Sequence, residues 1–178
     1  MIYLETERLV LRRFSEADID HLVDLDSDPA VTRYINGGKP TSREFVVQQV
    51  MPRILSYYAD LVDQGIWAAI DKESHDFIGW FHLRPNRTNP AETELGYRLK
   101  HKYWGQGIAT EGSQALLKKG FKELGVDIAV AIADPNNFAS IRVMEKVGMS
   151  YLGEFKEADD FLVVKYGLTA AVYFAQND

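Results

Sequence analysis

Hydrophobic and polar residues alternate near the start of the chain, over residues 4–14. Leu9 and Leu11 fall on one side of this stretch, so the alternation predicts a first β-strand. Ser15 and the acidic residues after it are typical of a helix N-terminus, because side-chain oxygens there accept hydrogen bonds from free N–H groups. That helix is expected to end, or to be interrupted, at the Asp-Pro pair of residues 28–29.

Apolar residues return with helical spacing over residues 41–61, which predicts a longer helix. Pro52 lies inside it and should bend or split it, because proline has no N–H to donate. Two short apolar runs follow, residues 66–70 and 77–83, separated by a polar loop short enough for an antiparallel hairpin. The first half of the chain is therefore expected to form helices and antiparallel strands.

The second half contains a short strand, residues 94–99, that leads through a loop with Gly105 and Gly107 into a helix. A nearly continuous apolar run over residues 126–133 then predicts a strand covered on both faces. Strand, helix and strand in this order favour a right-handed parallel crossover. One further helix and two final strands are expected over residues 137–147, 149–157 and 161–169. The predicted fold class is α/β in a single domain, residues 1–178, with a mixed, mostly antiparallel central sheet, one parallel crossover at the glycine loop and flanking helices.

The two glycines of this loop point to anion binding. Gly105 and Gly107 have no Cβ, so the loop can adopt positive φ angles and bring its backbone close to a ligand. The first N–H groups of the following helix have no intrahelical partners and lie at the positive end of the helix dipole, which suits a pyrophosphate. An ordinary strand-to-helix turn is one alternative. A dinucleotide-binding G-x-G-x-x-G turn is another, but Thr110 stands at its last glycine.

Composition narrows the classes of function. The 178 residues include no cysteine, which excludes disulfides, thiolate metal sites and a cysteine nucleophile. The four histidines show no metal-ligand spacing, so no metal is predicted. With 20 Lys and Arg against 26 Asp and Glu, the formal net charge of -6 argues against nucleic acid as a partner. No signal-peptide pattern and no apolar run near the roughly 20 residues of a membrane span are found, so we expect a soluble, cytoplasmic protein with no membrane partner.

Four segments of the chain carry a family resemblance. They are Thr6–Arg12 (TERLVLR), Glu94–Tyr97 (ELGY), Tyr103–Glu111 (YWGQGIATE) and Asn137–Met149 (NFASIRVMEKVGM). In this order they resemble the GNAT superfamily of acyl-CoA-dependent N-acetyltransferases, and the branch of the ribosomal-protein N-terminal acetyltransferases is the most similar. The resemblance implies acetyl-CoA as co-substrate, a ternary complex and transfer of acetyl from sulfur to an amine nitrogen. A homodimer is common in this branch.

The resemblance implies a cofactor site around the glycine loop. Backbone N–H groups from Gly105 to Thr110 are expected to hold the CoA pyrophosphate, and the strand before the loop to offer unpaired backbone groups to the pantetheine amides. The expected cofactor-binding residues are Tyr97, Leu99, Trp104, Gly105, Gln106, Gly107, Ile108, Ala109, Thr110, Asn137 and Arg142. Asn137 can equally act as a plain helix N-cap. Arg142 or Lys146 either meets the 3′-phosphate of CoA or is a solvated side chain.

Candidate catalytic residues come from the strand before the loop and from the last predicted helix. Glu94 or Glu92 is expected to take a proton from the acceptor ammonium, because only a neutral amine has a lone pair for attack on a thioester. The alternative is a pair of solvated carboxylates at a sheet edge. Family members often carry a tyrosine on the last helix as general acid, but this chain has Met144 in its place, so the resemblance shifts the role to Ser140. The Ser140 hydroxyl can instead bond back to a helix carbonyl.

The predicted function is an acetyl-CoA-dependent N-acetyltransferase that works by direct attack on the thioester. The resemblance favours a protein N-terminus as acceptor, and a polyamine or a small amine such as an antibiotic are the alternatives. Region 26–45, with its Gly-Gly loop, is the candidate for acceptor selection. Two other classes stay open, a non-catalytic acyl-CoA sensor that the missing tyrosine makes conceivable and a dinucleotide-binding oxidoreductase.

Overall fold

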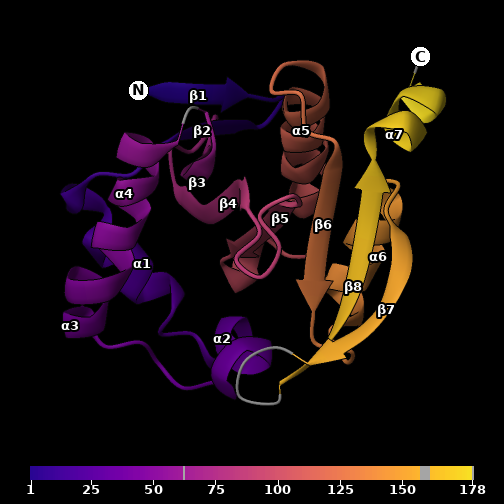
Figure 1. Ribbon diagram of the computed structural model, residues 1–178. Coiled ribbons are helices and arrows are strands. Elements are labelled where there is room, and N and C mark those ends of the chain that lie inside the picture. The colour runs from indigo at the N-terminus through magenta and orange to yellow at the C-terminus, as the bar shows by residue number, and fades with distance from the viewer. Residues whose placement is uncertain (62, 157–160, 178) are drawn as a thin grey trace.

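One eight-stranded mixed sheet forms the centre of the protein (Figure 1). The computed structural model describes residues 1–61, 63–156 and 161–177. Its strand order is β1-β2-β3-β4-β5-β6-β8-β7, and among the described strands only β5 and β6 pair in parallel. The mixed sheet with one parallel crossover is confirmed. The strands are β1 (Ile2–Glu5), β2 (Leu9–Arg13), β3 (Gly65–Asp71), β4 (Phe77–Pro85), β5 (Thr93–Leu99), β6 (Ile128–Ala133), β7 (Ser150–Lys156) and β8 (Leu162–Thr169).

Helices cover both faces of this sheet. On one face a core that includes Leu22, Met51 and Ile54 packs the N-terminal helices against β3 and β4, and on the other Phe81 and Leu116 belong to the core under α5. Figure 1 shows the N-terminal helices beside the sheet and α6 behind its C-terminal strands. Across the three described ranges, no helix is long and apolar enough to span a bilayer. The helices are α1 (Ile19–Leu25), α2 (Pro29–Asn36), α3 (Arg43–Phe45), α4 (Met51–Asp60), α5 (Ile108–Lys122), α6 (Phe138–Lys146) and α7 (Ala170–Asn177).

The predicted first strand is wrong in its extent, because the chain forms a hairpin there. β1 and β2 pair antiparallel across a turn at residues 6–8. The Thr6 N–H donates to the Leu9 carbonyl at 2.9 Å, and the Leu9 N–H donates to Thr6 Oγ1 at 3.0 Å. The threonine hydroxyl closes this turn as an asparagine or serine often does elsewhere. The turn occupies only three positions. This is too few to interrupt the alternation of hydrophobic and polar residues, so the pattern does not reveal the turn.

The proline positions have two different outcomes. The first helix, α1, ends at Leu25, shortly before the Asp-Pro pair at which its end was predicted, and this pair begins α2, an unpredicted helix. Asp28 Oδ1 accepts a hydrogen bond from the Ala30 N–H at 2.8 Å, and Pro29 suits the first helical position because an N–H there has no partner. The predicted effect of Pro52 is confirmed, because a π-helical turn over Val46–Val50 separates α3 from α4. The terminal helix α7 was also not predicted.

Strands β5 and β6 separate soon after they meet. Their register pairs are Thr93 with Ala129 and Glu94 with Val130, and no later pair joins them in the described part of the chain. β5 continues to pair with β4 on its other side as far as Leu99. The β6-facing backbone of β5 is therefore left without ladder partners after Glu94, and backbone groups of this kind are available to a ligand. A crossover is where open sheets bind ligands.

Candidate functional site

The loop between β5 and α5 has the geometry of an anion cradle. Gly105 and Gly107 have φ angles of 72° and 79°, and Gly107 precedes the first turn of α5. The space that a Cβ on Gly105 would fill is open, with no heavy atom within 4 Å. The Glu111 N–H donates to the Gly107 carbonyl, so the N–H groups of Ile108–Thr110 come before the helical ladder begins. Such N–H groups bind phosphate oxygens.

The turn between β1 and β2 supports this cradle. Glu111, in the first turn of α5, accepts hydrogen bonds from the Thr6 hydroxyl at 2.5 Å, the Arg8 N–H at 2.9 Å and Arg8 Nε at 2.6 Å. Arg8 Nη1 also donates to the Gln106 carbonyl at 2.8 Å. Burial opposes the ionisation of Glu111, but these hydrogen bonds and the charge of Arg8 more than offset it and hold the pKa of Glu111 below its usual range. Two distant segments of the chain thus form one unit at the loop.

Glu111→Ala should destabilise the protein by about 1–3 kcal/mol at neutral pH, because it leaves the donors of Thr6 and Arg8 without their acceptor. Because the pKa of Glu111 is lowered by folding, its stabilisation is present at neutral pH and lost as the pH falls through the folded-state value. The deficit should therefore shrink in acid, which thermal unfolding at several pH values measures. Glu123→Ala is the control, since Glu123 at the C-cap of the same helix has an exposed side chain that pairs with Lys119. Equal unfolding midpoints for the two variants at neutral pH would contradict the supporting role.

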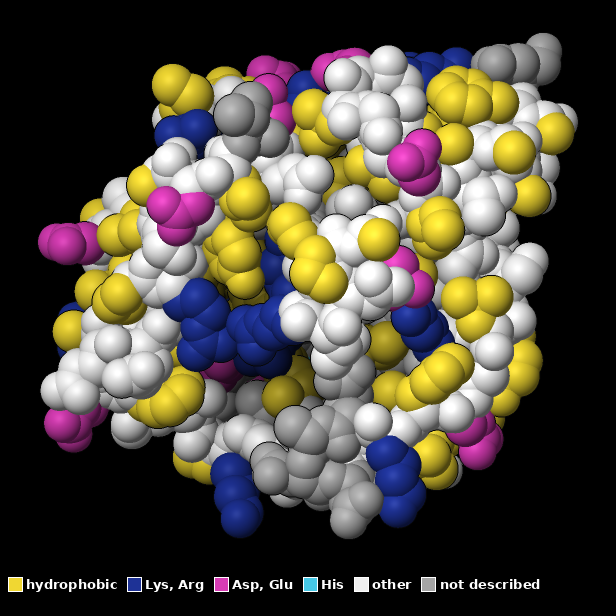
Figure 2. All heavy atoms as spheres, viewed as in Figure 1, with side chains coloured by type: hydrophobic (Ala, Val, Ile, Leu, Met, Phe, Trp, Pro, Cys, Tyr) yellow, Lys and Arg dark blue, Asp and Glu magenta, His cyan; other side chains and the backbone are white. Residues whose placement is uncertain are grey.

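A cavity of about 330 Å³ lies where β5 and β6 separate. Its walls come from β4, β5, β6, β8, α2, α5 and α6. Successive side chains of a strand point to opposite faces, so Glu94 and Arg98 leave β5 on one face and Tyr97 on the other. Arg98 pairs with Trp80, which packs against the core of the N-terminal helices, so the first face is the one toward α1 and α4. Figure 2 shows a hollow between α4 and the segment after β4, with Lys and Arg side chains gathered in it.

Glu94 lies in a buried polar cluster on this first face. Arg84 Nη2 donates to Glu94 Oε1 at 2.7 Å, and His82 Nε2 lies 3.2 Å from the same oxygen. Burial opposes the ionisation of Glu94, but His82 and the positive charges of Arg84 and Arg87 more than offset it and hold the pKa of Glu94 below its usual range. Glu94 is therefore ionised at neutral pH. It lines the cavity, and its side chain is only 12% exposed, so it is not a solvated carboxylate at a sheet edge.

The other face of β5 carries a pair of hydroxyl groups. The Tyr97 hydroxyl donates to Ser140 Oγ on α6 at 3.2 Å. Burial raises the pKa of Tyr97, against a smaller opposite effect of that hydrogen bond, so the phenol keeps its proton at neutral pH. Met144, one turn after Ser140, is buried and lines the same cavity. The cavity therefore has a tyrosine hydroxyl in its lining, but this tyrosine comes from β5 and not from α6.

Some of the predicted cofactor-binding residues have structural partners of their own. Asn137 Oδ1 accepts the Ser140 N–H at 3.2 Å, which confirms Asn137 as the N-cap of α6. The Trp104 indole Nε1 donates to the Leu99 carbonyl at 2.8 Å, so this carbonyl already has a partner in the loop. Arg142 is exposed on α6. The binding roles of these residues stay predictions.

Glu92, the second candidate base, lies just before β5 and away from the cavity lining. Lys165 of β8 contacts its Oε2 at 2.6 Å, and Asn86 Nδ2 donates to the same oxygen at 3.4 Å. This carboxylate therefore joins β8 to the start of β5. Of the two glutamates, only Glu94 is brought to the cavity.

A family model described as "Acetyltransferase (GNAT) domain" matches residues 8–150. The chain belongs to the GNAT acetyltransferase family. This acetyltransferase is 36% identical over 152 residues to protein YkkB of Bacillus subtilis (strain 168), a match that covers 83% of the chain and 85% of YkkB. It is also 30% identical over 159 residues to the FsC-acetyl coenzyme A-N(2)-transacetylase of Aspergillus fumigatus, over 85% of the chain and 66% of that protein.

Solved structures share the fold of this acetyltransferase. A GNAT-family acetyltransferase from Bacillus anthracis matches with a TM-score of 0.75 and 27% identity, over 96% of this chain and 99% of that one. RimL, a ribosomal L7/L12 alpha-N-protein acetyltransferase in complex with coenzyme A, matches in fold with a TM-score of 0.77 and 20% identity, over 95% and 98%.

The protein is thus a GNAT-type N-acetyltransferase with acetyl-CoA as its co-substrate, and the oxidoreductase alternative is set aside. Within the described ranges, no group of three or more His, Cys, Asp or Glu side chains could hold a metal ion.

Sequence reasoning missed three features of this candidate site. It gave His82 no role, although alternation along β4 puts His82 and Arg84 on one face as a polar stripe in an apolar strand. It used Tyr97 for its backbone alone, and the partner of the Tyr97 hydroxyl lies on another element. Arg8 and Glu111 both belong to segments that carry the family resemblance, but nothing in the sequence shows that they meet.

Proposed function

We propose that this acetyltransferase transfers acetyl from acetyl-CoA to a primary amine by direct attack in a ternary complex, with a protein N-terminus as the acceptor. The observation that carries the proposal is the cavity between β5 and β6, with an ionised carboxylate on one face of β5 and a hydroxyl pair on the other. Direct transfer needs a proton acceptor near the amine and a proton donor near the sulfur. The two faces of one strand supply both.

The glycine loop suits the donor substrate. The N–H groups from Gly105 to Thr110 would hold the pyrophosphate, and the open space beside Gly105 allows the phosphates a close approach. The unpaired backbone of β5 after Glu94 would receive the pantetheine amides as an added strand. Both features lead toward the cavity, so the thioester would arrive between the carboxylate and the hydroxyl pair.

The chemistry then follows from the residues around the cavity. Glu94 takes one proton from the acceptor ammonium, directly or through water, and the neutral amine attacks the thioester carbonyl while a backbone N–H polarises its oxygen. The new C–N bond forms as the C–S bond breaks. Ser140 donates a proton to the departing thiolate, and Tyr97, whose hydroxyl donates to Ser140, resupplies it. The attacking nitrogen loses its second proton as the amide forms, and this proton returns through water to Tyr97, so the hydroxyl pair ends unchanged.

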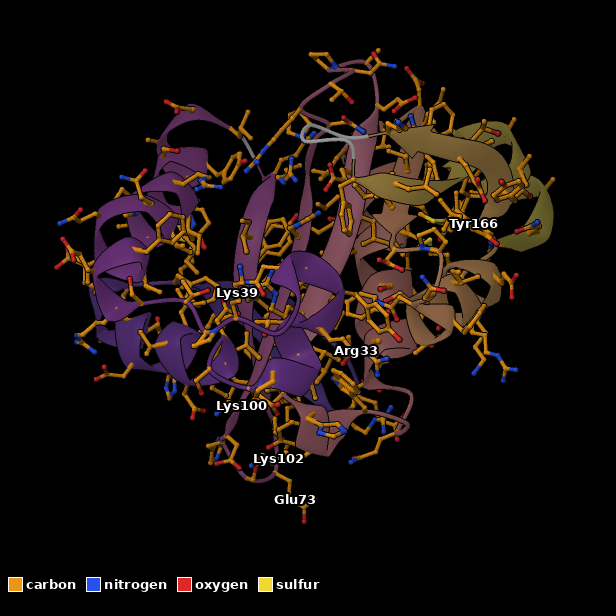
Figure 3. The ribbon with its side chains drawn as sticks, turned by 90° about the horizontal axis from the view of Figure 1, so that it is seen from below. Arg33, Lys39, Glu73, Lys100, Lys102 and Tyr166 are labelled. Atoms are coloured by element: carbon orange, nitrogen blue, oxygen red, sulfur yellow. The ribbon has the colours of Figure 1, made fainter. Side chains whose placement is uncertain are left out.

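Helix α2 is the proposed site of acceptor selection, within region 26–45. Tyr34 and Ile35 of α2 line the cavity, and Ile35 is 47% exposed, so part of this wall faces solvent. Figure 3 shows Arg33 of the same helix where α2 approaches the C-terminal half of the molecule. A wall that opens to solvent can admit the end of a peptide chain. The fold likeness to RimL supports a protein N-terminus. The Aspergillus relative is named FsC-acetyl coenzyme A-N(2)-transacetylase, and this name supports a different amine nitrogen as the second candidate.

A panel of amines with detection of released thiol tests the acceptor. We expect release with peptides that have a free N-terminus and none with the same peptides N-terminally blocked, including those with an internal lysine. Mass spectrometry should place the acetyl group on the terminal nitrogen. Faster turnover of spermidine or an aminoglycoside would replace the peptide as acceptor. No release with any amine would favour a non-catalytic acyl-CoA sensor. A homodimer and a cytoplasmic location stay proposals that rest on the family resemblance.

A further inference from the structure

His82 of β4 is held rigidly at the wall of the cavity, although the mechanism above does not use it. The residue is 7% exposed, and its register partner on β5 is Gly96. A Cβ on Gly96 would lie 2.7 Å from both Cε1 and Nε2 of the imidazole, so β5 can pair here only with a glycine. Trp80 stacks against the imidazole with ring centroids 5.6 Å apart. The strand pairing thus makes room for this ring beside Glu94.

The Nε2 atom of His82 has no hydrogen-bond partner among the described residues. It lies 3.2 Å from Glu94 Oε1, close enough for each group to shift the pKa of the other, but the two are not aligned well enough for a regular hydrogen bond. Glu94 Oε1 already accepts a hydrogen bond from Arg84. A buried polar atom without a partner requires an explanation, and a substrate or a transferred proton is one.

The charged and titratable groups that face His82 are Glu94 of β5, Arg84 of its own strand and Arg87 of the following loop. Burial lowers the pKa of His82, Glu94 acts in the opposite direction, and the two guanidinium groups reinforce the lowering. The imidazole is therefore neutral at neutral pH beside an ionised carboxylate. In this state the His82–Glu94 pair has room for one more proton.

We propose that His82 receives the proton of the acceptor ammonium and that Glu94 stabilises the imidazolium so formed. This inference rests on the proposed function, and it moves the base from Glu94 alone to the His82–Glu94 pair. One N–H bond of the ammonium breaks as an N–H bond to the imidazole forms. The freed lone pair then makes the C–N bond, the C–S bond breaks, and Ser140 protonates the thiolate. The second proton of the nitrogen returns through water to the Tyr97–Ser140 pair. After the product leaves, the imidazolium returns its proton to water. A carboxylate beside an imidazole supports proton transfer in the same way in Ser-His-Asp triads.

Rescue by small heterocycles separates this role from simple packing. His82→Ala should lower kcat/KM about a hundredfold with CoA affinity retained. Added imidazole should restore at least a tenth of the lost rate, whereas pyrazole, a ring of the same size that is far less basic, should not. Equal restoration by both rings would show that His82 only fills space and would overturn the proposal. So would a wild-type rate in the unrescued variant.

The pH dependence of kcat/KM gives a second test. It does not require a variant in which the imidazole leaves an empty space, in case His82→Ala does not fold. In the wild type, activity should fall as the pH drops and the His82–Glu94 pair takes up its proton. His82→Gln should move this acid limb to lower pH, because only a carboxylate is left to titrate. The control is His21→Gln, whose ring is exposed and stacks on Phe77, and which should leave the limb in place. If an active His82→Gln variant keeps the acid limb of the wild type, the role of His82 is overturned and the proposed function is not. Absence of thiol release from the wild type with every amine would instead overturn the proposed function, and the inference with it.

Discussion

Gly107→Asp is expected to weaken CoA binding by at least about a hundredfold while the protein stays folded. Gly107 has a φ of 79° at the N-cap of α5, and aspartate is among the side chains best tolerated in both situations. Its carboxylate would lie against the N–H groups that the pyrophosphate needs. It would also compete for Arg8, whose Nη2 lies 3.5 Å from the position of an added Cβ. Each lost amide bond to a phosphate oxygen costs on the order of 1.5–3 kcal/mol, and about 1.4 kcal/mol is a factor of ten in affinity.

Isothermal titration calorimetry with CoA measures this change. Gly125→Asp is the matched control, because Gly125 follows the other end of α5 with a φ of 67° and nothing within 4 Å of an added Cβ. It introduces the same side chain into the same backbone conformation, away from the cradle, and should bind CoA as the wild type does. Tight binding by a folded Gly107→Asp variant would refute the cradle.

Glu94→Gln is expected to lower kcat/KM by roughly 10²–10⁴-fold with CoA affinity unchanged. Glutamine keeps the shape of the side chain, but it can neither take the ammonium proton nor stabilise an imidazolium at His82. The change also leaves Arg84 without its carboxylate partner, and removing one member of a buried ion pair costs about 3–5 kcal/mol of stability. Steady-state kinetics must therefore be measured well below the unfolding temperature of the variant.

Glu92→Gln distinguishes the two candidate bases, because it breaks an ion pair of similar burial and should destabilise the protein by a similar amount. The Glu92 side chain is 15% exposed, and its carboxylate is paired with Lys165 at 2.6 Å, as that of Glu94 is with Arg84. Only Glu94 lines the cavity, so the loss of kcat/KM should be far smaller for Glu92→Gln than for Glu94→Gln. The reverse order would move the base to Glu92. Small losses of kcat/KM in both variants would show that neither carboxylate takes part in the reaction.

Much of this fold can be predicted from local patterns. The splitting of a helix near Pro52, the cap at Asn137 and the start of α5 after Gly107 each depend on residues within one or two turns of each other. The hairpin of β1 and β2 could not be predicted, because the Thr6 hydroxyl closes its turn within a regular alternation. Helix α2 was missed because proline both ends one helix and suits the first turn of the next.

The order of residues along the chain is enough to predict the family, through four segments that resemble it. It also predicts the mixed sheet and an anion-binding loop, since these follow from periodicity, glycine and helix-end chemistry over short stretches. The candidate site could be assembled only from the tertiary structure. The contact of His82 with Glu94 depends on the register of β4 against β5, and that of Tyr97 with Ser140 depends on how α6 packs beside the open end of β5. A shift of one residue in that register would send each β5 side chain to the opposite face of the sheet. Strand pairing and helix packing therefore decide which groups can exchange a proton, through contacts between residues far apart in the chain.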